Sequence, residues 1–189
     1  MPREYFAQRT RILFAAEGAS ERSYGTWLHK LAEERGLNLH IDSWLCGTGG
    51  GDLLSLARRA QNRIREQARL RRSYNIRCLL LDKDKLGDNP DRDQQGFAIA
   101  RERRIRIIWQ EWDHEAFLLR HLPGCATLRP SSGQSERALK RRWPEYRKNM
   151  AAQDIGKKLD ANAVGRAARI EPDLRDFLVS VGWPLADQQ

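Results

Sequence analysis

Carboxylates follow two short apolar stretches of the chain. Glu17 comes directly after the run RILFAA at residues 11–16. Asp82 and Asp84 come directly after the run IRCLLL at residues 76–81. If both runs are parallel strands, these carboxylates meet at the carboxyl edge of one sheet, where ligands bind in open α/β folds. Such oxygens suit Mg²⁺ or Mn²⁺ and repel one another without a cation, although their spacing alone leaves a structural role as turn or helix caps open.

Strand and helix patterns alternate over the first two thirds of the chain. The expected strands are residues 11–16, 39–46, 76–81 and 105–109. The expected helices run from the N-cap Ser20 to the stop at Gly36, from the N-cap Asp52 to about residue 72, over 94–103, and over 112–122. Because parallel strands need a crossover that is usually helical, this order predicts an α/β fold: a parallel sheet of about four strands flanked by helices.

The pattern changes after residue 125. We expect residues 1–125 to form the α/β domain and residues 126–189 to form a helical C-terminal extension packed on it. The extension should contain a short basic helix from Ser135 that ends at Pro144, a helix over 160–169 behind Asp160, and one over 172–182.

The composition favours a polyanionic partner. Lys and Arg outnumber Asp and Glu by 34 to 25, which gives a formal net charge of +9. A field of this sign attracts nucleic-acid phosphates, although charge alone does not identify a partner. The candidate nucleic-acid-binding residues lie in two basic clusters: Arg58, Arg59, Arg63 and Arg65 in the first, and Lys140, Arg141 and Arg142 in the second.

Other features exclude several classes of protein. The cysteines Cys46, Cys78 and Cys125 are odd in number and lack CxxC spacing, which indicates reduced, buried thiols rather than disulfides or a zinc site. No run of about 18 apolar residues is present, so we expect a cytosolic protein without a membrane span. The glycine-rich loop at residues 47–51 lacks the end of a P-loop; a plain strand-to-helix connection is favoured, and an anion-binding turn stays open.

Three motifs in order resemble a known superfamily. The EG pair at Glu17 and Gly18, followed by the DxD at residues 82–84, resembles the Toprim superfamily of topoisomerases, primases and OLD-type nucleases. The segment WDHEAFLLRHL at residues 112–122 is similar to the helix after the fourth strand of RloB-like Toprim proteins, and Tyr146-Arg147-Lys148 is similar to their YxK. The resemblance covers about residues 10–150. It departs from the family at His114 and at Glu111-Trp112-Asp113, where that family usually has an aromatic residue and a Ser-Asn-Pro turn.

The resemblance implies roles for particular residues. Glu17 would be a general base or metal ligand, and Asp82 and Asp84 would be ligands of Mg²⁺ or Mn²⁺. Glu115 would be a further carboxylate of the site, or else an ordinary first-turn glutamate favoured by the helix dipole. Lys148 would stabilise charge on the scissile phosphate, although its basic surroundings favour a general phosphate contact. The histidines at 114 and 121 are expected to be packing or surface residues.

The resemblance also implies a function. The chain would be a divalent-metal-dependent endonuclease that cleaves DNA or RNA phosphodiesters, with a role in antiphage defence. The alternative is a non-catalytic or partner-controlled Toprim subunit that binds nucleic acid or an ATPase. Topoisomerase activity is not expected, because it requires a second large domain with a nucleophilic tyrosine and the 65 residues after position 124 offer little room.

Overall fold

A four-stranded parallel sheet forms the centre of the computed structural model, which describes residues 8–47, 51–84, 86–131 and 133–185. The strands are β1 (Thr10–Ala16), β2 (Leu39–Leu45), β3 (Ile76–Asp82) and β4 (Arg106–Gln110). Their order in the sheet is β2-β1-β3-β4, and each neighbouring pair is parallel. The expected α/β fold is therefore confirmed, with all strand ends within one residue of their expected positions.

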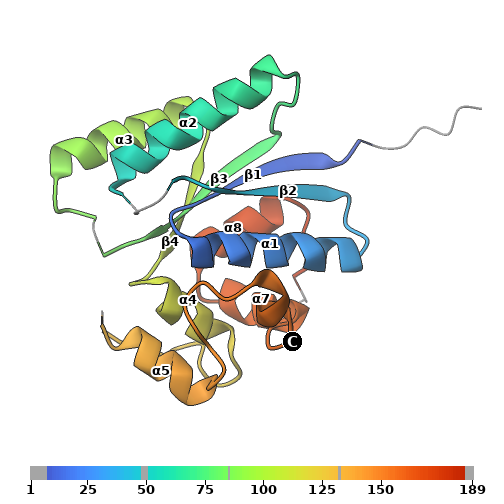
Figure 1. The fold of residues 1–189 in the computed structure, drawn as a ribbon, viewed down its shortest axis with the longest axis vertical. Coiled ribbons are helices and arrows are strands. Elements are labelled where there is room, and N and C mark those ends of the chain that lie inside the picture. The colour runs from blue at the N-terminus through green and yellow to red at the C-terminus, as the bar shows by residue number, and fades with distance from the viewer. Residues whose placement is uncertain (1–7, 48–50, 85, 132, 186–189) are drawn as a thin grey trace, which may run out of the picture.

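Helices cover both faces of the sheet, as Figure 1 shows. The helices α2 (Leu53–Arg69) and α3 (Pro90–Glu102) lie on one face, and α1 (Ala19–Glu34) and α8 (Pro172–Ser180) lie on the other. Because side chains alternate along a strand, β1 sends Leu13 and Ala15 to the first face and Ile12 and Phe14 to the second. All four of these side chains are fully buried, so β1 is apolar on both sides.

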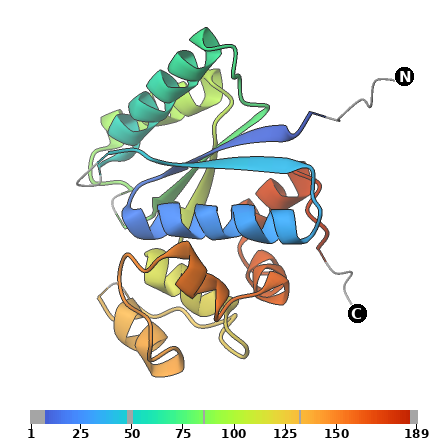
Figure 2. The ribbon, with the colours of Figure 1, turned by 45° about the vertical axis from the view of Figure 1, so that its right-hand side comes forward.

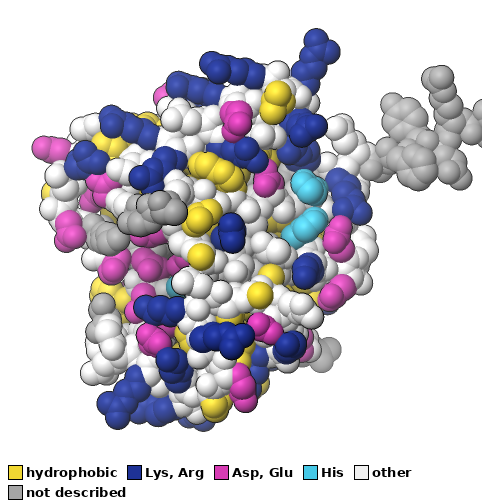
Figure 3. Space-filling view, viewed as in Figure 1, with side chains coloured by type: hydrophobic (Ala, Val, Ile, Leu, Met, Phe, Trp, Pro, Cys, Tyr) yellow, Lys and Arg dark blue, Asp and Glu magenta, His cyan; other side chains and the backbone are white. Residues whose placement is uncertain are grey.

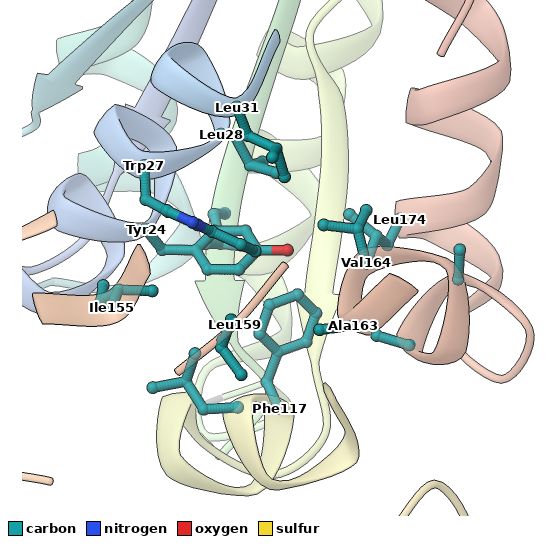
Figure 4. Close-up of a cluster of buried hydrophobic side chains, with 14 of the residues drawn as sticks. Tyr24, Trp27, Leu28, Leu31, Phe117, Ile155, Leu159, Ala163, Val164 and Leu174 are labelled. Carbon is teal, nitrogen blue, oxygen red and sulfur yellow. The ribbon is translucent and has the colours of Figure 1, made fainter. Parts of the chain in front are cut away.

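The remaining helices extend the second face into a larger helical layer (Figure 2). They are α4 (His114–His121), α5 (Ser135–Arg142), α6 (Ala152–Gly156) and α7 (Ala161–Ala168). Figure 4 shows Tyr24 and Trp27 of α1 packed with Phe117 of α4, Ile155 of α6 and Val164 of α7. The helices after residue 126 thus share one hydrophobic core with the sheet and α1. The expected boundary at residue 125 itself stays a prediction.

Several expected helix ends are confirmed. Asp52 caps α2 by accepting the backbone N–H of Ser55, and Asp160 caps α7 by accepting that of Ala163. Gly36 has a φ of 67°, the left-handed conformation in which glycine commonly follows a helix.

Other expectations were wrong. Ser20 is not the N-cap of α1; Gly18 is, and the Ser20 hydroxyl instead accepts the backbone N–H of Asn149 at 3.0 Å. Helix α3 begins at Pro90 rather than at residue 94, because Asn89 caps it and proline fits the first helical position. Helix α2 ends at Arg69, α4 begins only at His114, and α6 was not expected.

The three cysteines are free and buried, as expected. Among the helices of the described ranges, none is long and apolar enough to cross a bilayer.

Replacing Phe177 tests whether the C-terminal helices stabilise the sheet. Its ring packs edge-on against Phe14 of β1, with centroids 5.9 Å apart, and is fully buried. We expect Phe177→Ala to lower the free energy of unfolding by about 3–5 kcal/mol in one cooperative transition. The control is Val179→Ala on the same helix, 63% exposed, which should change stability by less than about 0.5 kcal/mol. Denaturant unfolding followed by circular dichroism measures both, and a separate transition of the C-terminal part would contradict the shared core.

Candidate functional site

The carboxyl edge of the sheet brings the ends of β1, β3 and β4 together. Glu17 follows β1, Asp82 is the last residue of β3, and Asp82 pairs in register with Gln110 at the end of β4. The chain turns immediately after Asp82, where the backbone N–H of Lys83 donates to the carbonyl oxygens of Gln110 at 3.1 Å and Trp112 at 3.3 Å. These bonds fix the turn after β3 against the loop after β4. Asp84 lies in that turn and is exposed.

Asp82 has the most perturbed carboxyl group of this edge. Burial, followed in order of size by the charges of Glu21, Glu17, Asp84 and Asp113, raises its pKa from the ordinary 3.8 to about 9. Its Oδ1 atom is buried and has no hydrogen-bond partner within the described structure. A buried carboxylate among like charges is costly unless a cation or a proton neutralises it. The site therefore favours a neutralised Asp82, either protonated or paired with a cation.

Glu21 joins this cluster from the first turn of α1. Its carboxylate folds back to accept the backbone N–H groups of Gly18 and of Glu21 itself, as the third helical residue does in a capping box. A Cβ atom at position 18 would lie 2.6 Å from Glu21 Oε2, so a side chain there would displace the Glu21 carboxylate. Burial raises the pKa of Glu21, while the backbone donors and the charge of Lys148 oppose that rise.

His114 lies beside Glu21 but stays neutral. Its Nδ1 is 2.6 Å from the side-chain amide nitrogen of Gln110 and 3.8 Å from Glu21 Oε1. Burial lowers the pKa of His114 to about 4, against the opposing charges of Glu115 and Asp113. The expected packing role fits this burial, although His114 also contacts the acidic cluster.

Glu115 connects the cluster to the C-terminal part of the chain. It lies in the first turn of α4, is buried, and accepts the hydroxyl of Tyr146 at 2.9 Å. Lys148 Nζ is 3.8 Å from Glu115 Oε1 and 3.8 Å from Glu136 Oε2. The tyrosine and lysine of the Tyr146-Arg147-Lys148 motif therefore both reach the glutamate of α4, more than 30 residues earlier in the chain.

A narrow crevice reaches the cluster from the α2 and α3 side. Its walls include Glu17, Asp82, Asp93 and Trp109. Asp93 is buried on the first turn of α3 and accepts the backbone N–H of Gly87 at 2.8 Å. The crevice thus adds a further carboxylate near the expected ones.

The donor set fits a hard cation, but it is not a closed cage. Within the described residues, no three His, Cys, Asp or Glu side chains converge tightly enough to enclose a metal ion. Mg²⁺ usually keeps several waters and takes one or two carboxylates plus substrate phosphates, so a closed protein cage is not required. The unpartnered Oδ1 of Asp82 and the carboxylates of Glu17 and Asp84 supply ligands of the required type.

The first basic cluster is divided between exposed and paired arginines. Arg58 and Arg65 are exposed on α2. The guanidinium nitrogens of Arg63 lie 3.3 Å from Asp42 Oδ2 and 3.1 Å from Glu66 Oε2, so Arg63 is paired with both carboxylates. The guanidinium group of Arg59 lies beside Gly47.

The second cluster lies on α5, where Lys140, Arg141 and Arg142 are exposed and Lys140 is 2.7 Å from Glu136. In Figure 3, acidic side chains gather at the left of this face, between regions of Lys and Arg side chains above and below them. Nucleic-acid binding by either cluster stays a prediction.

The glycine-rich loop falls partly outside the described residues, because positions 48–50 are not among them. At its end Asp52 pairs with Arg92 of α3, and this guanidinium holds the pKa of Asp52 well below its usual range. Asp52 thus connects the start of α2 to α3.

Comparisons of the chain with protein-family models, with curated proteins and with solved structures gave no match. The resemblance to RloB-like Toprim proteins therefore stays a prediction from the motifs.

Sequence reasoning missed Glu21, Asp93 and Asp113 as members of the acidic edge. Glu21 had a recognisable signal, because a glutamate three residues after a cap is typical of a capping box. Asp113 had one too, because an aspartate directly before a helical run is a typical N-cap. In the structure Asp113 is the N-cap of α4 and accepts the backbone N–H of Ala116. The approach of Asp93 to the crevice depends on how α3 packs, which no local pattern shows.

The pH dependence of stability tests the environment of Asp82. The pKa of Asp82 is raised in the folded protein, so below about pH 4 Asp82 is protonated in both the folded and the unfolded protein. As the pH rises above this value, Asp82 ionises in the unfolded chain but not in the folded protein, and this ionisation favours unfolding. In a chelator, wild type should lose stability relative to Asp82→Asn between about pH 4 and 9, by more than about 1.4 kcal/mol, the value of one pKa unit. Denaturant titrations of both proteins across this range measure the difference. A constant difference would contradict the buried, repelled carboxylate.

Proposed function

We propose that this chain is a divalent-metal-dependent nuclease that hydrolyses phosphodiesters at the carboxyl edge of its sheet. One observation carries the proposal: the buried Oδ1 of Asp82 has no hydrogen-bond partner in the described structure, and the charges of Glu21, Glu17 and Asp84 all act on this carboxyl group. Such a group of charges is stabilised by a cation, and cations held by carboxylates in this way commonly bind phosphate oxygens.

The ion would be held by Asp82, with Glu17 and Asp84 as further ligands directly or through water. When bound, it would orient the phosphate, lower the pKa of an attacking water and shield the leaving oxygen. We propose that Glu17, which lies in the crevice wall, accepts the proton of that water. The water oxygen would bond to phosphorus as its proton passes to Glu17, the bond from phosphorus to the leaving sugar oxygen would break, and that oxygen would take a proton from solvent while Glu17 returns its own to solvent.

Lys148 supplies positive charge on the other side of the cluster. It is held between Glu115 and Glu136, and its charge also acts on Glu21. The side chain is 61% exposed, so its ammonium group can reach a phosphate while remaining close to the carboxylates. We propose that it stabilises the charge that develops on the scissile phosphate, and that Tyr146 positions Glu115 beneath it.

The net charge of +9 and the exposed cations of α2 and α5 support a nucleic-acid substrate. The proposal extends to foreign nucleic acid, and to control by an ATPase, only through the resemblance to RloB-like Toprim proteins.

Cleavage by carboxylate variants tests the proposal. We expect wild type to cleave labelled plasmid, single-stranded DNA or total RNA in Mn²⁺, and Glu17→Gln to lower the rate at least about a hundredfold. Asp82→Asn, Asp84→Asn and the double variant should lose similar amounts, because residues that act through one ion are not additive.

The matched controls are Glu34→Gln and Asp176→Asn, which remove exposed carboxylates at the end of α1 and on α8. They should retain the wild-type rate. If the loss of cleavage rate in the double variant equals the product of the losses in Asp82→Asn and Asp84→Asn, the two aspartates do not act through one metal ion. Full activity in a folded Glu17→Gln protein would likewise show that Glu17 does not belong to the site. Metal binding without any cleavage would instead favour the non-catalytic subunit.

A further inference from the structure

An apolar groove lies between α3 and the edge strand β4. Its volume is about 840 Å³, within the range of sites that bind small molecules. The floor is formed by Ile105, Ile107 and Trp109, alternate residues that face the same side of the sheet. Phe97 of α3 forms the opposite wall.

The aromatic side chains of the groove remain accessible. Phe97 is 37% exposed, and Trp109 is only partly buried. Their ring centroids are 6.2 Å apart and their planes are inclined by 63°, so the two rings form a corner rather than a closed stack. Such a corner presents aromatic faces to a flat ligand.

The groove is continuous with the acidic edge. Leu86, Asp93 and Trp109 line both the groove and the crevice that contains Glu17 and Asp82. Trp109 also pairs in register with Leu81, the residue before Asp82. This continuity connects the groove to the substrate of that site rather than to an unrelated ligand.

Polar groups lie along the α3 side of the groove. Gln94, Phe97 and Arg101 recur at helical spacing on α3 and all line it. Arg101 is exposed and, among the described residues, pairs with no carboxylate. An amide and an unpaired guanidinium beside an apolar floor suit a ligand with a flat ring and a phosphate.

We propose that this groove binds an unpaired base of single-stranded nucleic acid, next to the phosphate that the acidic edge cleaves. The inference rests on the proposed nuclease function and specifies its substrate class. In a duplex, both faces of each base are covered by stacking, so only an unpaired or extruded base can enter an apolar groove. The base would stack on Trp109 or Phe97, and Arg101 would bind a neighbouring phosphate.

Binding of short oligonucleotides in Ca²⁺ tests the inference without cleavage as the readout. The probes are oligothymidylate and oligouridylate of about twelve nucleotides, within the site sizes of single-strand binders, and a hairpin duplex of equal charge. We expect wild type to prefer one or both single strands over the hairpin. Phe97→Ala and Trp109→Leu should each weaken single-strand binding about tenfold and leave hairpin binding within about twofold. The deoxy and ribo probes distinguish DNA from RNA.

Val179→Ala, which removes an exposed apolar side chain on α8, is the control and should bind as wild type does. Equal binding of hairpin and single strands, or unchanged affinity in both groove variants, would overturn the inference even if the protein cleaves nucleic acid in Mn²⁺. The molecular mass of the protein without nucleic acid gives a further test. If wild type has the mass of a dimer and Phe97→Ala that of a monomer, a second copy of the chain occupies the groove and the inference is overturned. Failure of the nuclease proposal is recognised separately, by absence of cleavage in Mn²⁺.

Discussion

Mutual repulsion among carboxylates at the carboxyl edge of the sheet is the constraint on which the proposed function depends. Asp82 ends the strand between β1 and β4, where burial and four neighbouring acidic residues oppose its ionisation. The surrounding hydrogen bonds hold these groups together: Glu21 is fixed by the start of α1, and Glu115 by Tyr146. A fold stabilised by its apolar core can maintain such a cluster, and a cation or a proton neutralises it.

The helical layer after residue 126 contributes to this edge as well as to the core. Met150, Ile155 and Leu174 belong to the same hydrophobic cluster as Phe14 and Tyr24. This packing holds the segment with Tyr146 and Lys148 against α4, where both contact Glu115. The C-terminal helices therefore position one positive charge beside the acidic residues, while the α3 side of the sheet leaves an apolar groove open to them.

Local patterns predicted the strands, because the run at 76–81 is too short and too apolar for a surface helix. Caps such as Asp52 and Asp160 also act locally and were predictable. The start of α3 could have been found from Asn89 and Pro90, but the polar composition of residues 85–93 favoured a loop. The contacts of Glu115 with Tyr146 and of Trp109 with Phe97 join distant segments, so only the packed fold brings them together.

Calorimetric titration of Mn²⁺ into the metal-free protein tests the central claim most directly, because it measures whether the acidic edge binds a cation at all. We expect wild type to bind Mn²⁺ at the Asp82 site and Asp82→Asn, with its fold confirmed by circular dichroism, to bind at least about tenfold more weakly. Absence of Mn²⁺ binding to wild type, or equal affinity in the two proteins, would contradict the account.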